Sequence, residues 1–96
     1  MVVEWLTFEV ERSELHDWLA IEEDVWSRFL EVQPGFLRKE MWVEHGDPDR
    51  VHAVIWWNSM EEWKRIGPDT VAEVDSRMGS QWRPCTMRVF DVARER

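Results

Sequence analysis

Apolar and polar side chains alternate along the first ten residues of the chain. An extended backbone would place them on two faces, one with Leu6, Phe8 and Val10 and the other with Val3, Trp5 and Thr7. A repeat of two residues is that of a β-strand. The pattern therefore predicts a strand over residues 2–10.

A helical repeat follows this first strand. Large apolar residues recur at spacings of three and four between residues 15 and 30: Leu15, Trp18, Leu19, Trp26, Phe29 and Leu30. Ser13 precedes them as a suitable N-cap residue, and Pro34-Gly35 ends the pattern. These features predict a first helix that packs on a sheet.

The middle of the chain has the composition of a β-hairpin. Residues 36–45 and 50–57 are rich in β-branched and aromatic side chains, and Gly46-Asp47-Pro48-Asp49 between them has turn composition. Ser59 and Glu62 then form a capping-box pair, which predicts the start of a second helix.

Gly67-Pro68 interrupts this second helix, because proline cannot continue it. We expect the helix to stop near Ile66, a further helical stretch over about residues 69–78 and a last strand over residues 84–92. The order strand, helix, strand, strand, helix, strand is the split βαβ (β-α-β-β-α-β) of ferredoxin-like α+β folds, with an antiparallel sheet and both helices on one face. Residues 1–96 are predicted to form this one domain.

The other face of such a sheet would be open. It would carry roughly half of a set of large apolar residues: Trp5, Met41, Trp42, Trp56, Trp57 and Met87. An apolar patch of that size is too large to leave in contact with water. We therefore expect a homodimer through the open sheet face.

Several short segments of the chain resemble one known superfamily. They are Gln33-Pro34-Gly35-Phe36, Lys39-Glu40-Met41-Trp42, Val54-Ile55-Trp56-Trp57-Asn58-Ser59 and Glu62-Trp63-Lys64. Together they resemble the antibiotic biosynthesis monooxygenase-like dimeric α+β barrels, and most of all a cyanobacterial branch. The resemblance implies a barrel closed across a dimer, with small-molecule pockets between each sheet and its own helices. Members include cofactor-free oxygenases, haem-degrading enzymes and isomerases.

Neither a cofactor nor a metal is expected. The haem-degrading members use an asparagine on the first strand and a histidine in the second helical region, whereas this chain has Trp5 and Thr7 in the first and no histidine in the second. Cys85 is the single cysteine, so a thiolate metal cluster is impossible. His16 and His45 do not have the spacing of zinc ligands.

Charge narrows the range of partners. Twenty acidic and twelve basic residues give a net charge of -8, which repels nucleic-acid phosphates and anionic lipids. The longest apolar run, residues 53–57, is far too short for a membrane span, and the first residues do not have the form of a secretory signal. We expect a cytoplasmic protein with no nucleic-acid or membrane partner.

Glu22 is the most anomalous polar residue, because it falls near the centre of the apolar stripe of the first helix. Burial among aromatic rings would suit it to act as a general base or acid toward a phenol or enol. The alternative is a structural ion pair with Lys39, which shares a strand face with Leu37 and Met41.

His52 alternates with Val54 and Trp56 in the third predicted strand. A neutral imidazole on a sheet wall would orient a substrate or act as a base. The alternative is a half-buried histidine whose hydrogen bonds are satisfied within the protein.

Tryptophan is unusually frequent, with eight residues and no tyrosine. A flat slot for an aromatic ligand would be lined by Trp18, Trp26, Phe36, Trp56 and Trp63, which would otherwise form an ordinary core. Arg88 on the last strand would bind a carboxylate or phenolate of such a ligand, or else pair with Glu4 across the sheet.

These residues support two functions. The first is a small-molecule-binding protein or cofactor-independent monooxygenase-like enzyme with a Trp-lined pocket between helices and sheet. In it, Glu22 or His52 acts as base, and a small aromatic ligand is bound by Trp18, Trp26, Lys39, Trp56, Trp63 and Arg88. The second is a non-catalytic dimeric binding or structural module, with the tryptophans in the core and interface. The sequence does not decide between them.

Overall fold

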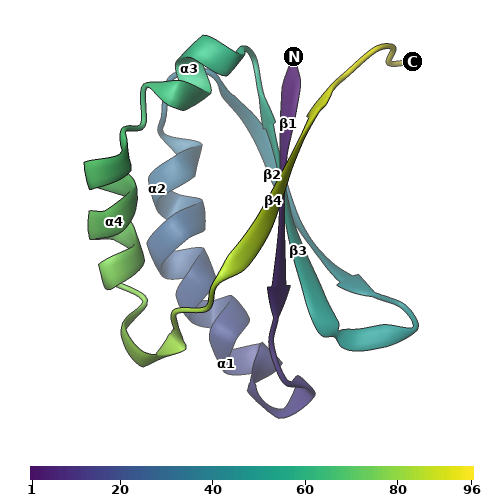
Figure 1. Ribbon diagram of the computed structural model, residues 1–96, viewed down its shortest axis with the longest axis vertical. Helices are drawn as coiled ribbons and strands as arrows, with labels where there is room; N and C mark the ends of the chain where they lie inside the picture. The colour runs from purple at the N-terminus through teal and green to yellow at the C-terminus, as the bar shows by residue number, and fades with distance from the viewer.

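Four strands form one antiparallel sheet (Figure 1). In a computed structural model that describes residues 1–96, they are β1 (Val2–Glu9), β2 (Phe36–Glu44), β3 (Asp47–Trp57) and β4 (Cys85–Asp91). The strand order is β2-β3-β1-β4, so the first strand is interior and the last lies at an edge. Together with the helices on one face, this order confirms the predicted ferredoxin-like α+β fold.

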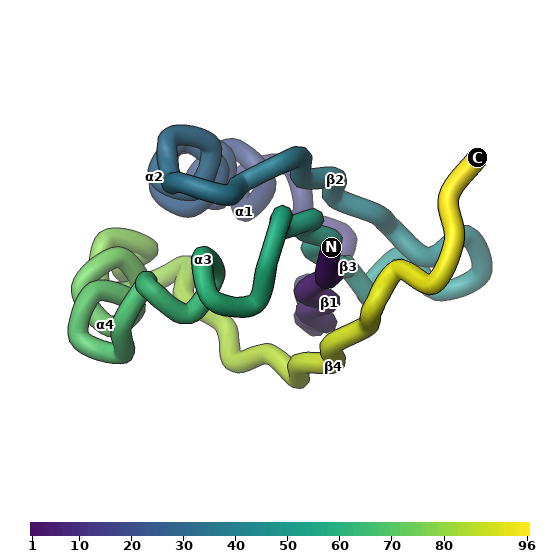
Figure 2. The backbone as a smooth tube through the Cα atoms, turned by 90° about the horizontal axis from the view of Figure 1, so that it is seen from above, coloured from purple at the N-terminus to yellow at the C-terminus, as the bar shows by residue number.

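The helices lie on one face of the sheet, as the view in Figure 2 shows. The first helical segment runs through α1 (Arg12–Glu22), a π-helical stretch (Glu23–Ser27) and α2 (Arg28–Glu31). The second region is divided at Gly67-Pro68, as predicted, into α3 (Met60–Lys64) and α4 (Pro68–Ser76). A 3₁₀ turn (Gly79–Gln81) follows before β4. No helix is long and apolar enough to cross a membrane.

The start of α1 differs from the prediction. The helix begins at Arg12, so Ser13 lies within its first turn and is not the N-cap. The backbone N–H of Arg12 donates to Asp49 Oδ1 of β3, at 2.9 Å. A carboxylate at this position also complements the positive end of the helix, so a residue distant in sequence performs the capping role.

The hairpin turn between β2 and β3 is shorter than predicted. It consists of His45 and Gly46, and residues 47–49 already belong to β3. The strand register shifts beside this turn, between Val43 and Glu44, so the pairing is irregular there. In the segment of β3 next to this shift, the Asp49 carbonyl accepts the N–H of Val10 at 2.9 Å, which links the hairpin to the end of β1.

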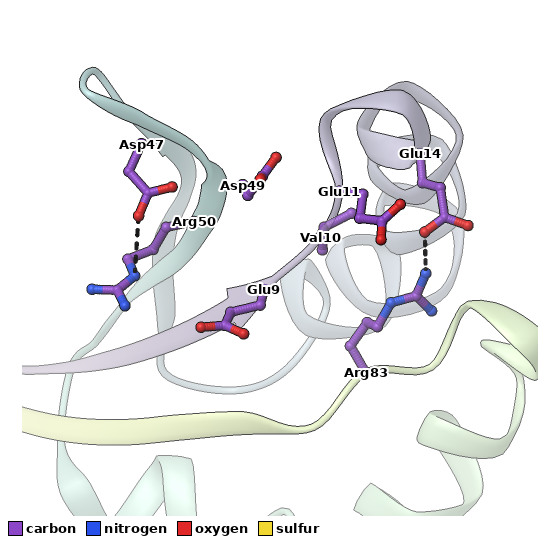
Figure 3. Close-up of a pocket in the computed structure, with 8 residues that line it drawn as sticks. All are labelled: Glu9, Val10, Glu11, Glu14, Asp47, Asp49, Arg50 and Arg83. Carbon is purple, nitrogen blue, oxygen red and sulfur yellow. Dashed lines mark hydrogen bonds and ion pairs between the residues drawn. The ribbon is translucent and has the colours of Figure 1, made fainter.

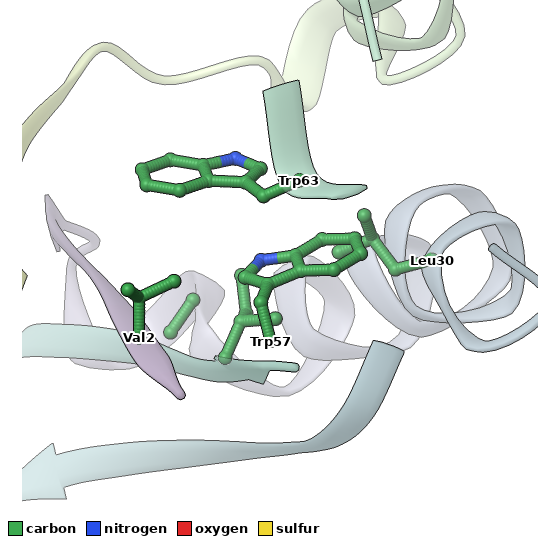
Figure 4. Packing of buried hydrophobic residues seen from close by; sticks show 6 residues of the cluster. Val2, Leu30, Trp57 and Trp63 are labelled. Atoms are coloured by element: carbon green, nitrogen blue, oxygen red, sulfur yellow. The ribbon is translucent and has the colours of Figure 1, made fainter. Parts of the chain in front are cut away.

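The core lies between the sheet and the helices in two clusters of buried residues. The first consists of Val2, Leu30, Ala53, Ile55, Trp57 and Trp63, of which four are labelled in Figure 4. The second consists of Val10, Trp18, Val51 and Met78. Alternate residues of β3 contribute to both clusters, because they share one face of the strand. Full burial of each large apolar side chain contributes ~1.5–3 kcal/mol, which holds the helices on the sheet.

Ser59 caps α3 as the sequence predicts. Its hydroxyl oxygen accepts the backbone N–H of Glu62 at 3.2 Å. The Glu62 carboxylate in turn accepts hydrogen bonds from the Asn58 amide, at 2.8 Å, and the Ser59 hydroxyl, at 3.0 Å. These two bonds hold the pKa of Glu62 below its ordinary value. The start of α3 is therefore fixed locally.

Candidate functional site

The predicted site residues divide between the two faces of the sheet. On the helix side lie Trp18, Glu22, Trp26, Lys39 and Trp63. On the open face lie His52, Trp56 and Arg88. Trp56 precedes Trp57 of the core in β3, and successive strand residues point to opposite faces. The interpretation that combined these residues in one pocket is therefore corrected, and the Glu4–Arg88 pair is absent for the same reason.

Glu22 and Lys39 form the buried ion pair that the sequence offered as an alternative. Lys39 Nζ donates to Glu22 Oε2, and their side chains are 6% and 5% exposed respectively. Ser27 Oγ donates to Glu22 Oε1 at 3.1 Å and accepts from Lys39 Nζ at 2.7 Å. The wider turn of the π-helical stretch brings Ser27 alongside Glu22, five residues earlier. Both carboxylate oxygens are thus engaged within the protein.

The helix-side tryptophans fill space and bind other parts of the chain. Trp18 is 1% exposed, and its indole N–H donates to the Gln81 carbonyl at 3.0 Å. The Trp26 indole donates to Asp75 Oδ1 at 3.0 Å, and Trp63 is buried in the first core cluster. Neither of the two cavities described below is lined by these residues.

Glu4 is a candidate residue that the sequence analysis did not select. Its carboxyl lies half-buried on the helix side, where the Trp57 indole N–H donates to Oε1 at 3.1 Å. Burial raises the pKa of Glu4, and the Trp57 hydrogen bond and the charges of Lys64 and Lys39 offset this only in part. No cation lies within ion-pair distance of it. The sequence contains a signal for the burial of Glu4, since this residue shares a strand face with the apolar Leu6.

An uncovered apolar strip borders Glu4. Met87 and Val89 of β4 pair with Leu6 and Glu4 of β1, so they face the helix side. No helix packs extensively against β4, and these two side chains remain 52% and 43% exposed. We call Cys85, Met87 and Val89 the β4 strip.

Cys85 is exposed at one end of the β4 strip. Partial burial of its thiol, with the nearby carboxylates of Asp75 and Glu4, raises the pKa of Cys85. The residue therefore stays in its thiol form at neutral pH and is not an activated nucleophile.

His52 lies at the centre of a hydrogen-bonded group on the open face. The Trp5 indole N–H donates to His52 Nδ1 at 3.1 Å, and Thr7 Oγ1 lies 3.0 Å from the same nitrogen. Because an indole nitrogen only donates, Nδ1 must accept, which assigns the imidazole proton to Nε2. Nε2 then donates to Glu44 Oε1 at 3.2 Å. Both ring nitrogens are engaged by protein groups.

This hydrogen-bonded group lines part of a hollow of about 740 Å³. Trp5 and Phe90 form its aromatic wall, with ring centroids 5.8 Å apart, and the Arg88 guanidinium lies 5.0 Å from the Phe90 ring. Trp42 meets Trp5 edge-on at 5.2 Å and continues the aromatic surface toward Trp56. The open face therefore has a hollow, which β1 and β4 line together with the hairpin ends of β2 and β3, and an aromatic part around Trp42 and Trp56.

A second cavity, of about 480 Å³, lies between the hairpin and the start of α1 (Figure 3). Its charged side chains are mainly carboxylates, and both of its cations are paired, Arg83 with Glu14 at 2.9 Å and Arg50 with Asp47 at 3.9 Å. No group of three or more potential ligands is arranged to hold a metal ion. We assign these residues to surface ion pairing.

No protein-family model and no curated protein matches the sequence. Solved structures do match the fold. A variant of SnoaB, a cofactor-independent oxygenase from Streptomyces nogalater, has a TM-score of 0.77 and 16% identity over 98% of this chain and 94% of that chain. A monooxygenase from ActVA-Orf6 of Streptomyces coelicolor, in complex with the ligand Nanaomycin D, has a TM-score of 0.79 and 18% identity over 98% and 88%. An antibiotic biosynthesis monooxygenase has a TM-score of 0.69 and 12% identity over 98% and 100%.

Identities this low establish the fold without an activity. The cyanobacterial branch stays a prediction, because none of these similarities bears on it. The chain has the ferredoxin-like α+β fold of the antibiotic biosynthesis monooxygenase-like proteins.

Proposed function

We propose that this chain binds small aromatic molecules on the helix side of its sheet, and that Glu4 acts there as the general base of cofactor-independent, monooxygenase-like chemistry. The observation that carries the proposal is the Glu4 carboxyl, half-buried with a raised pKa and held by the Trp57 indole. A carboxyl without an ion-pair partner at the margin of a core costs stability. Such a group suggests a functional role.

The β4 strip supplies the surface for the ring of the ligand. Met87 and Val89 are apolar, exposed and directly beside Leu6 and Glu4 on the same face. Methionine adapts its shape to aromatic partners and makes favourable sulfur contacts with their ring edges. A ring bound there would bring a hydroxyl substituent toward the Glu4 carboxyl.

The chemistry begins with proton removal from an aromatic hydroxyl. The resulting phenolate is electron-rich enough to react with dioxygen without a cofactor. A phenol has a pKa of about 10, so a carboxyl with a raised pKa accepts its proton at a smaller energetic cost than an ordinary carboxylate. Two structures of the same fold support this class of reaction and ligand, one a cofactor-independent oxygenase and the other a complex with Nanaomycin D.

Glu4→Gln tests the role of the base. Glutamine keeps an oxygen that accepts the Trp57 N–H, so the fold should persist. We expect oxygen uptake with 1-naphthol to fall at least about 100-fold, because general base catalysis contributes that much. Glu9→Gln, an exposed residue of the same strand, is the matched control and should leave uptake unchanged. Equal uptake by wild type and Glu4→Gln would remove Glu4 from the mechanism.

Glu22 and His52, which the sequence nominates as bases, receive the same test. In our proposal neither abstracts the proton, because both carboxylate oxygens of Glu22 and both ring nitrogens of His52 are engaged. Glu22→Gln and His52→Gln should therefore keep oxygen uptake in the fraction that is folded. Loss of uptake by a variant that melts like the wild type would transfer the role to that residue.

We further propose that a second copy of the chain packs on the aromatic part of the open face. Trp42 is 38% exposed, and Trp56 beside it carries the Arg38 guanidinium at 4.1 Å from its ring. Covering these rings would remove a large apolar area from water. Light scattering should give a mass near twice 11.7 kDa, and Trp42→Glu should reduce it to that of one chain. A wild-type monomer in dilute solution would contradict the dimer.

A non-catalytic dimeric binding or structural module is the second candidate. The Glu22–Lys39 pair favours it, because these two buried side chains bind each other and are not accessible to a ligand. If the protein binds Nanaomycin D but consumes no oxygen with any hydroxylated naphthalene as substrate, the result would support the non-catalytic module and contradict the enzyme.

A further inference from the structure

The hollow on the open face is a second candidate ligand site, on the opposite side of the sheet from Glu4. Thr7 and Thr86 pair across β1 and β4 and form its floor, and their small side chains leave the space between larger neighbours. Its volume of about 740 Å³ is within the range of roughly 300–1,000 Å³ that small-molecule sites occupy.

Arg88 is the cation of this hollow that is free to bind. Its guanidinium contacts the Phe90 ring and has no ion-pair partner, whereas Arg50 pairs with Asp47 at 3.9 Å. Arg38, on the same face outside the hollow, pairs with Glu40 at 2.6 Å. A guanidinium fork matches the two oxygens of a carboxylate.

The charges that line the hollow are less unfavourable to an anion than those of the rest of the molecular surface. Arg50 and Arg88 balance Glu9 and Glu44 there, whereas the whole chain has a net charge of -8. Glu44 is occupied by the His52 Nε2–H. An anion would therefore meet less repulsion at Arg88 than over most of the surface.

The aromatic wall of the hollow is already in place. The Trp5 indole is fixed by its hydrogen bond to His52 and by edge contacts with Trp42 and Phe90. A preformed wall binds an aromatic ring with little loss of side-chain freedom. His52 is thus a positioning residue, since it holds Trp5.

We propose that this hollow binds a small aromatic carboxylate, with the carboxylate on Arg88 and the ring against Trp5 and Phe90. The proposal is independent of the chemistry at Glu4, because the two sites lie on opposite faces of the sheet. The dimer proposed above uses the same face of the sheet, around Trp42 and Trp56, and a second copy that also covered the hollow would exclude the ligand.

The test is calorimetric titration with 2-naphthoate, with the uncharged 2-naphthamide as the ligand control. Arg88→Gln removes the guanidinium, and Arg38→Gln makes the same change in net charge on the same face. Loss of a charged hydrogen-bonded contact should weaken 2-naphthoate binding at least about tenfold in Arg88→Gln. Arg38→Gln and Glu4→Gln should bind within about twofold of the wild type, and 2-naphthamide should not distinguish Arg88→Gln from the wild type.

Three results would overturn the proposal. One is binding by Arg88→Gln equal to that of the wild type, and another is an equal loss in Arg38→Gln, which would show only a long-range effect of charge. The third is no binding by the wild type, as would occur if a second copy filled the hollow. Loss in Glu4→Gln with retention in Arg88→Gln would place the ligand on the helix side and leave the proposed function standing.

Discussion

Lys39→Met should be among the most destabilising single substitutions of this chain. The Lys39 and Glu22 side chains are only 6% and 5% exposed, and the lysine engages both Glu22 and Ser27. Without it, the Glu22 carboxylate stays buried with one hydrogen bond, from Ser27. Breaking a buried pair by removing one partner costs ~3–5 kcal/mol. For a chain of this length, that loss lowers the melting temperature by at least ~12 °C.

Urea unfolding followed by tryptophan fluorescence measures this cost. Arg28→Met is the control: it removes the ion pair of Arg28 with Asp24, in which the two side chains are 69% and 70% exposed. This substitution should lower the free energy of unfolding by ~0.5 kcal/mol or less. The double substitution Glu22→Leu with Lys39→Met should recover most of the loss, because no unpaired charge is left in the core. An unfolding free energy for Lys39→Met within ~1 kcal/mol of the wild type would refute the reasoning that the pair is sealed.

Three further substitutions test local features. Burial raises the folded-state pKa of Glu4, so the wild type loses stability as pH rises from below the ordinary carboxyl pKa of 4.5 through the raised folded-state pKa. Glu4→Gln does not have this loss and should gain stability relative to the wild type over that rise in pH, as measured by urea titrations. Ser59→Ala removes the cap of α3 and should cost ~1 kcal/mol in thermal unfolding. Gly35→Ala should cost at least ~1–3 kcal/mol by urea midpoint, because Gly35 has a φ of 85° and an added Cβ would lie 2.5 Å from Glu62 Cβ. A cost near zero for either of the last two would contradict the local geometry.

The order of the elements could be predicted because it depends on local signals. The Ser59 and Glu62 capping pair and the Gly67-Pro68 break act within a few residues, and both are present in the structure. The start of α1 could not be predicted, because its cap is Asp49 of another element. The π-helical stretch was also missed, since one added residue per turn scarcely changes the apolar repeat.

The faces of the sheet were harder to assign than its strands. Both faces of β3 carry apolar or aromatic residues: Val51 and Trp57 lie on one face, and Val54 and Trp56 on the other. The alternation of residues therefore does not show which face the helices cover. The Glu22–Lys39 pair was one of the two alternatives that the sequence offered for Glu22, because each residue interrupts an apolar stripe. Glu4 interrupts one as well, but its accessibility depends on the absence of a helix over β4. That is a property of the tertiary structure.

Methionine methyl NMR tests most directly whether the ligand binds beside Glu4 on the β4 strip. The chain has five methionines, and of these Met87 belongs to the strip, while Met60 on α3 is a comparably exposed internal control. With ¹³C-methyl methionine, addition of Nanaomycin D should shift the Met87 signal strongly and leave that of Met60 in place. Binding detected by tryptophan fluorescence while the Met87 signal stays unchanged would contradict the account.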